Sequence, residues 1–253
     1  MASKREKRIL KEFKELEESK DILIQSGIYF YYDEENINTV YSMLYGPEGT
    51  PYEKGFYFFK FEYPESYPMS PPIAHYCTQG MLHNSKTNDS FHVRFNPNLY
   101  VCKKVCLSML NTWNGPGWVP TNTMSNVLVA LQAIVLNEEP LKNEPGFEFS
   151  NKDIIDKYNN IIKYANIKIS VLEMLETQPL KFEVFKDTMN DLFLKNIEFY
   201  KNFILTNNDI FKDNIIESPA YGMTCKIEYA PLLYKIEDYE KKITVDLLGK
   251  MSI

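Results

Sequence analysis

The sequence predicts an α+β fold followed by a helical tail, and three observations support this prediction. Apolar residues recur with helical spacing at the start of the chain, four runs typical of strands follow, and the helical period returns after residue 122. The 253 residues, 44% hydrophobic and 25% charged, have the composition of a globular protein. A chain of this length has room for one domain of about 150 residues and a substantial extension.

The first predicted element is an amphipathic helix over residues 4–20. Ile9, Phe13 and Leu16 lie on one face of it, and the other face is basic. Four runs rich in aromatic and β-branched residues come next. They cover residues 28–32, 37–45, 55–63 and 73–77. Because short strands joined by tight turns pair with their neighbours, these runs predict a four-stranded antiparallel meander.

A long loop over residues 79–120 separates the predicted sheet from the later helices. It shows little periodicity, and a loop of this length inside a compact domain is usually functional. Helices are expected over residues 123–135, 152–176, 181–205 and 232–248. Pro179 interrupts this pattern, so we divide the chain into a core domain, residues 1–178, and a helical C-terminal extension, residues 179–253.

Charge and composition argue against several classes of function. The chain has 28 Lys and Arg against 34 Asp and Glu, a net charge of −6, and general nucleic-acid binding needs a basic face instead. No apolar run of about 18 residues predicts a membrane span, and the first residues lack the apolar stretch of a secretory signal. Four cysteines indicate a reducing compartment. We therefore expect a cytoplasmic location, with the nucleus as a second compartment.

Cys106 is the strongest candidate for a reactive group. A thiolate attacks carbonyl carbon readily, and a thioester keeps its acyl group activated. No histidine adjoins Cys106 in the sequence, so acyl transfer from a thiol to an amine suits this cysteine better than hydrolysis of a stable amide. Taken alone, however, the apolar neighbours Val105 and Leu107 favour an inert core thiol.

Common phosphate- and metal-binding motifs are absent from the sequence. There is no Gly-x-x-x-x-Gly-Lys-Ser/Thr loop and no His-Glu-x-x-His pair. A zinc-stabilised interaction domain remains an alternative, with His83, His92, Cys102 and Cys106 as ligands, although their spacing matches no common pattern. Cys102 and Cys106 are close enough in sequence to form a disulfide on oxidation, which is a second alternative.

The residues around Cys106 resemble the active-site region of the ubiquitin-conjugating enzymes. Phe95-Asn96-Pro97-Asn98 comes before Cys106, with eight positions from Asn98 to the cysteine, and Trp118-x-Pro120 follows. Other family features occur in the same order over residues 4–147: the basic helix, the Tyr45–Gly55 turn, the Tyr67–Pro72 loop and the helix from Thr123. The sequence is most similar to the large Z-type branch of this family, which carries a helical C-terminal extension. The resemblance therefore implies a ubiquitin-conjugating fold with such an extension.

The resemblance implies a role for each matching residue. Cys106 would accept ubiquitin, or a ubiquitin-like protein, from an activating enzyme as a thioester and pass it to a substrate lysine or a ligase. Asn98 would hydrogen-bond the oxyanion or brace the nearby loop. Glu144 would orient or deprotonate the lysine, unless it is only a solvated loop carboxylate. The resemblance implies no cofactor and no metal, because the activating enzyme has already used ATP.

Partner surfaces follow from the same resemblance. Lys7 and Arg8, on the basic face of the first helix, match the docking site for the activating enzyme, although a charged helix face is often only solvated. Met69 matches a position that contacts ubiquitin ligases, and Pro120 with Thr121 matches a second one. An exposed methionine between proline groups suits an interaction surface better than a core.

Two departures from the family pattern keep a non-catalytic, ubiquitin-binding module open as an alternative. Asn96 stands where most members have histidine, and Ser108 stands where many have an aspartate near the cysteine. The first change affects loop support more than chemistry, and the second removes one acidic neighbour of the incoming amine. The enzyme hypothesis also requires that the sulfur of Cys106 can be reached from solvent.

Overall fold

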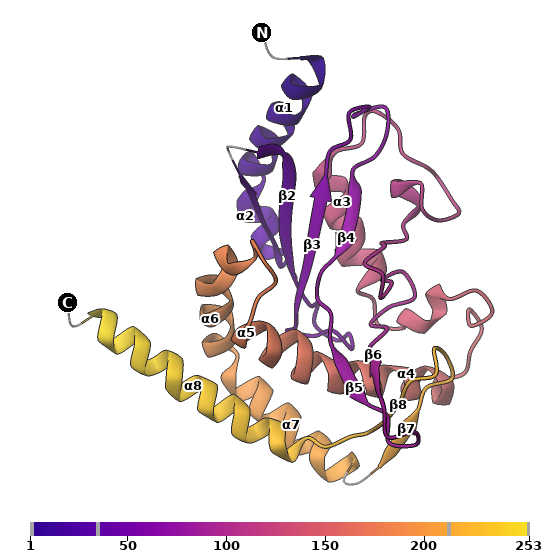
Figure 1. Ribbon diagram of the computed structural model, residues 1–253, viewed down its shortest axis with the longest axis vertical. Helices are drawn as coiled ribbons and strands as arrows, with labels where there is room; N and C mark the ends of the chain where they lie inside the picture. The colour runs from indigo at the N-terminus through magenta and orange to yellow at the C-terminus, as the bar shows by residue number, and fades with distance from the viewer. Residues whose placement is uncertain (1–2, 34–35, 212–213, 252–253) are drawn as a thin grey trace.

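The computed structural model describes residues 3–33, 36–211 and 214–251. A four-stranded antiparallel sheet in the order β1-β2-β3-β4 lies at its centre, as the sequence predicts (Figure 1). Its strands are β1 (Ile28–Asp33), β2 (Asn36–Tyr45), β3 (Phe56–Glu62) and β4 (Ile73–Tyr76). The aromatic residues of β3 are buried on both faces of the sheet. Tyr57 and Phe59 lie on the side of Phe95 and Tyr76, and Phe58 lies on the opposite side.

The N-terminal helix packs against this sheet but is shorter than predicted. Helix α1 (Lys4–Glu18) begins with a capping box between Ser3 and Glu6, and α2 (Lys20–Gln25) follows after a break at Ser19. The ring of Phe13 stacks on that of Tyr32 in β1, with 4.0 Å between the ring centroids. The apolar stripe read from the sequence is therefore the face that α1 buries.

The predicted structureless loop contains a hairpin, so that prediction is wrong in part. Strands β5 (Met81–His83) and β6 (Ser90–His92) pair in antiparallel fashion, and a short 3₁₀ helix, η1 (Ser108–Leu110), follows the active-site segment. The turn between the strands is stabilised by the side chain of Asn84, which accepts from the N–H groups of Lys86 and Thr87.

The C-terminal half of the core is helical, as predicted. Its elements are α3 (Met124–Ala130), η2 (Leu131–Val135), η3 (Pro140–Asn143), α4 (Lys152–Ala165), η4 (Asn166–Glu173) and α5 (Met174–Glu176). Thr123 caps α3 through a capping box with Asn126, and Asn151 caps α4. None of the helices in the described part of the chain has the length and apolar character that a membrane crossing requires.

The extension is only partly as predicted. Its elements are η5 (Glu183–Phe185), α6 (Lys186–Lys195), α7 (Ile197–Phe211), β7 (Ile215–Glu217), β8 (Thr224–Lys226) and α8 (Ala230–Met251). The single helix expected over residues 181–205 is wrong, because the backbone leaves helical geometry at Asn196, with φ −113° and ψ 18°, and α6 ends there. The β7–β8 hairpin was not expected from the sequence.

The extension packs against the outer face of the sheet. Phe182 lies edge-on to Tyr41 at 5.3 Å and against Phe58 at 4.8 Å between ring centroids. Tyr200 of α7 donates to the carbonyl of Lys54 at 2.7 Å, and α8 runs alongside α7 (Figure 1). The extension is thus joined to the sheet by a buried aromatic cluster. The domain boundary between residues 178 and 179 stays a prediction.

Candidate active site

Asn98 and Cys106 lie side by side, joined by two hydrogen bonds in opposite directions. The N–H of Cys106 donates to the carbonyl of Asn98 at 2.8 Å, and the side-chain amide of Asn98 donates to the carbonyl of Cys106 at 2.7 Å. The eight-residue spacing noted in the sequence therefore corresponds to a direct contact between these two residues.

Asn96 holds Asn98 in place from beneath. Its side-chain oxygen accepts from the N–H of Asn98 at 2.8 Å, and its amide nitrogen donates to the hydroxyl of Tyr52 and the carbonyl of Val135. Asn96 is fully buried, so each of these bonds forms away from competing water. The asparagine that replaces the usual histidine thus supports the loop.

The amide of Asn98 braces the cysteine segment in this structure. The side chain is 6% exposed, and its oxygen has no hydrogen-bond partner among the described residues. A primary amide carries two N–H donors, and only one bond from this nitrogen is present here. The group is therefore suited both to bracing and to donating toward an oxyanion, the two roles expected for it.

The expectation that the sulfur of Cys106 is open to solvent is wrong for this structure, because the residue is only 1% exposed. The following segment folds back beside it. The hydroxyl of Thr112 accepts from the N–H of Leu107 at 2.9 Å and donates to the carbonyl of Val105 at 2.8 Å. These bonds close residues 105–112 into a compact loop.

Cys106 lies in an apolar setting. Val105 and Leu107 on either side of it belong to the continuous apolar core, and Cys106 is buried to a similar degree. In an extended segment alternate side chains point to opposite sides, so the side chain of Cys106 points away from those of its two neighbours. A cleft of about 260 Å³ lies beside the same segment and is lined in part by Val105, Thr112 and Cys102.

The predicted ligase-contact residues lie on two loops that Trp118 holds together. The indole N–H of Trp118 donates to the carbonyl of Pro68 at 2.7 Å, which ties its loop to the loop that carries Met69. Met69 is 73% exposed, and Pro120 and Thr121 are also exposed. The geometry therefore presents these three residues to solvent on adjacent loops.

The two predicted docking residues of α1 have different surroundings. Lys7 is exposed, whereas Arg8 donates to the carboxylate of Glu12 at 2.7 Å and to the carbonyl of Asn122 at 2.8 Å. Glu12 is 1% exposed and also accepts from the hydroxyl of Tyr67 and the N–H of Met124. Arg8 therefore stabilises the fold, and docking of the activating enzyme at these residues stays a prediction.

Glu144 is half-buried at the end of η3, and its carboxylate accepts a hydrogen bond from the hydroxyl of Tyr221 in the extension. Arg94 lies nearby, with its guanidinium 3.4 Å from the ring centroid of Tyr100 and 5.2 Å from that of Tyr221. Sequence reasoning missed Tyr221 and Arg94 as site residues. The motif Arg94-Phe95-Asn96-Pro97-Asn98 was a signal for the arginine, but nothing in the sequence pointed to Tyr221.

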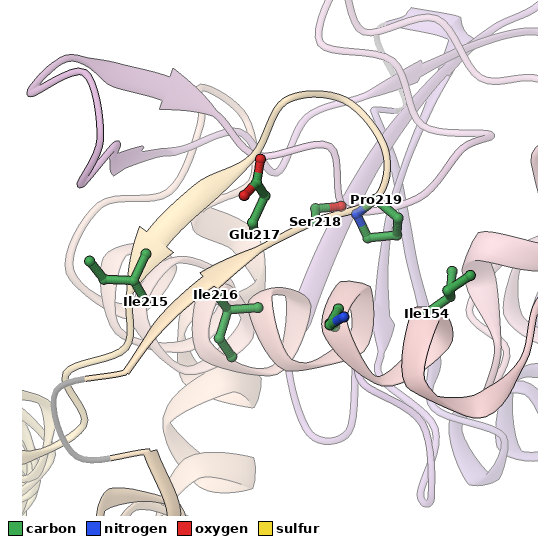
Figure 2. A pocket seen from close by; sticks show the side chains of 7 residues that line it. Ile154, Ile215, Ile216, Glu217, Ser218 and Pro219 are labelled. Atoms are coloured by element: carbon green, nitrogen blue, oxygen red, sulfur yellow. The ribbon is translucent and has the colours of Figure 1, made fainter.

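The zinc alternative finds no geometric support in the described part of the chain, where no group of three or more His, Cys, Asp or Glu side chains could hold a metal ion. All four cysteines are free thiols in this structure, and a disulfide between Cys102 and Cys106 on oxidation stays a prediction. A cavity of about 660 Å³ lies away from Cys106, between α4 and the hairpin of the extension. Figure 2 shows Ile154 on the α4 side of this cavity, with Ile216 and Ser218 on the hairpin side.

Comparison with known proteins decides the family. A family model described as "Ubiquitin-conjugating enzyme" matches residues 8–165, which contain the sheet, the Asn98–Cys106 contact and α4. The chain belongs to the ubiquitin-conjugating enzyme family. The α+β ubiquitin-conjugating fold expected from the sequence is therefore confirmed.

Several curated relatives share the name "Ubiquitin-conjugating enzyme E2 Z". The protein from Danio rerio is 33% identical over 218 residues, which cover 86% of this chain and 63% of that protein. The one from Xenopus tropicalis is 37% identical over 218 residues, covering 86% and 66%. The one from Homo sapiens is 37% identical over 176 residues, covering 69% and 47%. The chain thus spans about half to two thirds of the length of these relatives.

Proposed function

We propose that this chain is an acyltransferase that accepts ubiquitin, or a ubiquitin-like protein, as a thioester on Cys106 and passes it to a substrate lysine or a ligase thiol. The observation that supports the proposal is the reciprocal hydrogen bonding between Asn98 and Cys106, which places a neutral amide donor beside the only cysteine at the family's active-site position. Because the chain belongs to this family, we expect the modifier to come from an activating enzyme, which carries it on its own thiol.

Each transfer is an exchange at one carbonyl carbon. The thiolate of Cys106 attacks the thioester of the activating enzyme, a new C–S bond forms, and the activating enzyme's thiolate leaves. Negative charge collects on the carbonyl oxygen in the tetrahedral intermediate, and an N–H of Asn98 can stabilise it without adding charge. Loss of one such donor costs other enzymes about 10²–10³-fold in rate, so we expect Asn98→Ala to slow loading by a factor within that range.

Loading requires that Cys106 be uncovered, because the residue is almost fully buried here. We propose that the loop of residues 105–112 opens locally to expose the sulfur. Alkylation at pH 8 tests this step. Exposed Cys102 should react first and Cys106 more slowly, at a rate set by loop opening. Cys225 should react last, because burial raises the pKa of its thiol to about 12.

The deciding experiment is incubation of the chain with activating enzyme, ATP and ubiquitin, followed by a non-reducing gel. We expect a band heavier by one ubiquitin that disappears on reduction. Cys106→Ser should give a band that resists reductant, because an oxygen ester forms in place of the thioester. Cys102→Ser is the matched control and should load like the unaltered chain. Absence of any loaded species would favour the non-catalytic ubiquitin-binding module.

We propose two partner surfaces on the same grounds. Lys7→Glu should slow loading several-fold at low salt, because the docking surface of an activating enzyme is expected to be acidic and surface charges steer association. Unchanged loading at low salt would contradict that docking site. Met69→Ala should weaken ligase-stimulated transfer and leave loading unaltered, as measured with a ligase that accelerates transfer by this chain.

We also propose that the protein acts in the cytoplasm and nucleus. The small number of cysteines supports a reducing compartment. Imaging of the tagged protein in its own cells, with compartment markers, tests this location. Accumulation in a secretory compartment would contradict it.

A further inference from the structure

The turn of the extension's hairpin reaches the active-site segment. The turn runs from Ser218 to Met223 and is closed by a bond from the N–H of Ser218 to the carbonyl of Met223 at 2.8 Å. The sulfur of Met223 accepts from the backbone N–H of Arg94 at 3.4 Å. A second contact is made by Tyr158 of α4, whose ring lies 6.2 Å from that of Tyr221 and whose hydroxyl donates to the carbonyl of Arg94 at 2.7 Å.

Arg94 connects this turn to the asparagine motif. Its guanidinium donates to the carbonyl of Asn96 at 3.1 Å and to that of Pro97 at 2.7 Å, immediately before Asn98. The same guanidinium lies against the ring of Tyr100 and near that of Tyr221. The extension therefore contacts residues whose backbone positions Asn98.

Tyr221 has an unusual backbone conformation. Its φ is +64°, and Gly222 next to it has a φ of +62°. Glycine adopts this left-handed region freely, but for a residue with a side chain this conformation costs about 1 kcal/mol or more of free energy. The backbone at Tyr221 is therefore strained, and the closed turn from Ser218 to Met223 holds it in this conformation.

The side chain of Tyr221 hydrogen-bonds the carboxylate of Glu144. The hydroxyl of Tyr221 donates to one carboxylate oxygen, Oε2, and Glu144 Oε1 has no hydrogen bond to a described residue. Burial, followed by the contact with Glu144, raises the pKa of Tyr221, so the phenol stays protonated and keeps its donor at physiological pH. One bond to a neutral donor fixes a carboxylate in orientation without neutralising its charge.

We propose that Tyr221 is a positioning residue for the transfer of ubiquitin to lysine. It fixes the carboxylate of Glu144 by a hydrogen bond, and the family resemblance assigns that carboxylate to the incoming amine. This inference rests on the proposed function, and it assigns to the extension a part in the second chemical step. Loading at Cys106 involves no amine, so removing only the hydroxyl of Tyr221 should leave loading unchanged.

Tyr221 acts in the transfer of ubiquitin from the sulfur of Cys106 to a lysine nitrogen. The neutral lysine nitrogen forms a bond with the thioester carbonyl carbon, and the C–S bond breaks so that Cys106 leaves as a thiolate. The nitrogen loses one proton, which passes to the Glu144 carboxylate and then to solvent. A carboxylate held in one orientation is more often in the geometry needed to accept the proton of the amine than a carboxylate that rotates freely.

The test separates the two steps. The chain is loaded with ubiquitin, further loading is stopped by removing ATP, and discharge to free lysine is followed as a single turnover. Tyr221→Phe keeps the ring against Arg94 and Tyr158 and removes only the hydroxyl. We expect discharge to lysine to fall about tenfold, the order expected from losing one hydrogen bond to a charged group, while the thioester still forms.

Two further variants exclude a merely structural role. If only the ring mattered, Tyr221→Phe would match the unaltered chain and Tyr221→Ala alone would be slow. If the hydroxyl acts through Glu144, the double variant Tyr221→Phe with Glu144→Gln should be no slower than Glu144→Gln alone. The control is Tyr234→Phe in α8, where the tyrosine is 73% exposed, and it should discharge normally.

The outcomes are distinguishable from failure of the proposed function. If the unaltered chain forms no thioester, the proposed function fails and this test cannot begin. If the chain loads and Tyr221→Phe discharges to lysine at the unaltered rate or faster, the positioning role is overturned and the proposed function stands. Additive losses in the double variant would also overturn it.

Discussion

The active-site segment and the extension meet at Arg94, and they are held there by different kinds of contact. Within residues 96–106 buried amides join near neighbours, such as Asn98 with Cys106, although Asn96 also bonds Tyr52 and Val135, which are distant in the chain. The extension makes its contacts through tyrosine and methionine side chains that are more distant in the chain, with a separation of 77 positions between Glu144 and Tyr221. Contacts between near neighbours leave a spacing in the sequence, whereas distant contacts leave none.

The largest expected effect tests how firmly the extension is attached. Phe182→Ala removes a ring that is 2% exposed and packed on Phe58 and Tyr41. We expect the free energy of unfolding to fall by about 3–5 kcal/mol, measured by urea denaturation. Leu180→Ala, at a residue 82% exposed, should change it by no more than about 0.5 kcal/mol. Equal effects of the two variants would mean that the extension contributes little to the fold.

The next effect tests the buried amides of the active-site segment. Asn96→Ala leaves the N–H of Asn98 and the carbonyl of Val135 without their partner, and Asn96 is fully buried. We expect a loss of about 2–3 kcal/mol in unfolding free energy, because each unsatisfied buried group is costly. Asn96→His, which restores the residue most common in the family, should recover part of that loss. A histidine variant no better than alanine would contradict the supporting role.

A smaller effect distinguishes the two basic residues of α1. Arg8→Ala leaves Glu12, which is 1% exposed, with one fewer charged partner, and it should cost about 1–3 kcal/mol of unfolding free energy. Lys7→Ala, at an exposed position, should change it by no more than about 0.5 kcal/mol. If both variants unfold like the unaltered chain, the Arg8 contacts are not structural.

The smallest effect concerns the surface contact between the two hairpins. Lys86, in the turn between β5 and β6, pairs with Glu217 of β7, and both side chains are more than half exposed. An exposed pair of this kind contributes about 0–1 kcal/mol. Lys86→Ala should therefore leave thermal unfolding nearly unchanged and should not alter discharge to lysine. A large loss of discharge would show that the hairpin contact, and not Tyr221, positions the site.

The sequence predicted the parts of the molecule that depend on periodicity or short spacing. The meander follows from aromatic and β-branched runs joined by turns, and α1 and α4 follow from helical stripes. The contact between Asn98 and Cys106 follows from a spacing shared with the family. The apolar neighbours of Cys106 indicated a buried thiol, whereas the enzyme hypothesis required an open one. The Thr112 bonds that close residues 105–112 could not be predicted from either pattern.

The extension was harder to predict for two physical reasons. A helical stripe over residues 181–205 gives no sign that Asn196 ends α6, since its backbone and side chain bond carbonyls that only a folded turn presents. The strands β7 and β8 have three residues each, too few for alternation to be recognised. Tyr221 reached no site prediction because its partners, Glu144 and Arg94, become neighbours only through the tertiary fold.

Glu12 connects α1 to two loops, so a variant that lacks α1 would also lose a support of those loops. This one carboxylate joins the N-terminal helix to Tyr67, which precedes the Met69 loop, and to Met124, which follows Thr121. Removing the first 18 residues would therefore take away a support shared by both loops that are proposed to face a ligase, although the Trp118 bond to Pro68 would remain. A shortened chain would alter the ligase surface together with the docking surface of the activating enzyme, whereas Lys7→Glu changes only the latter.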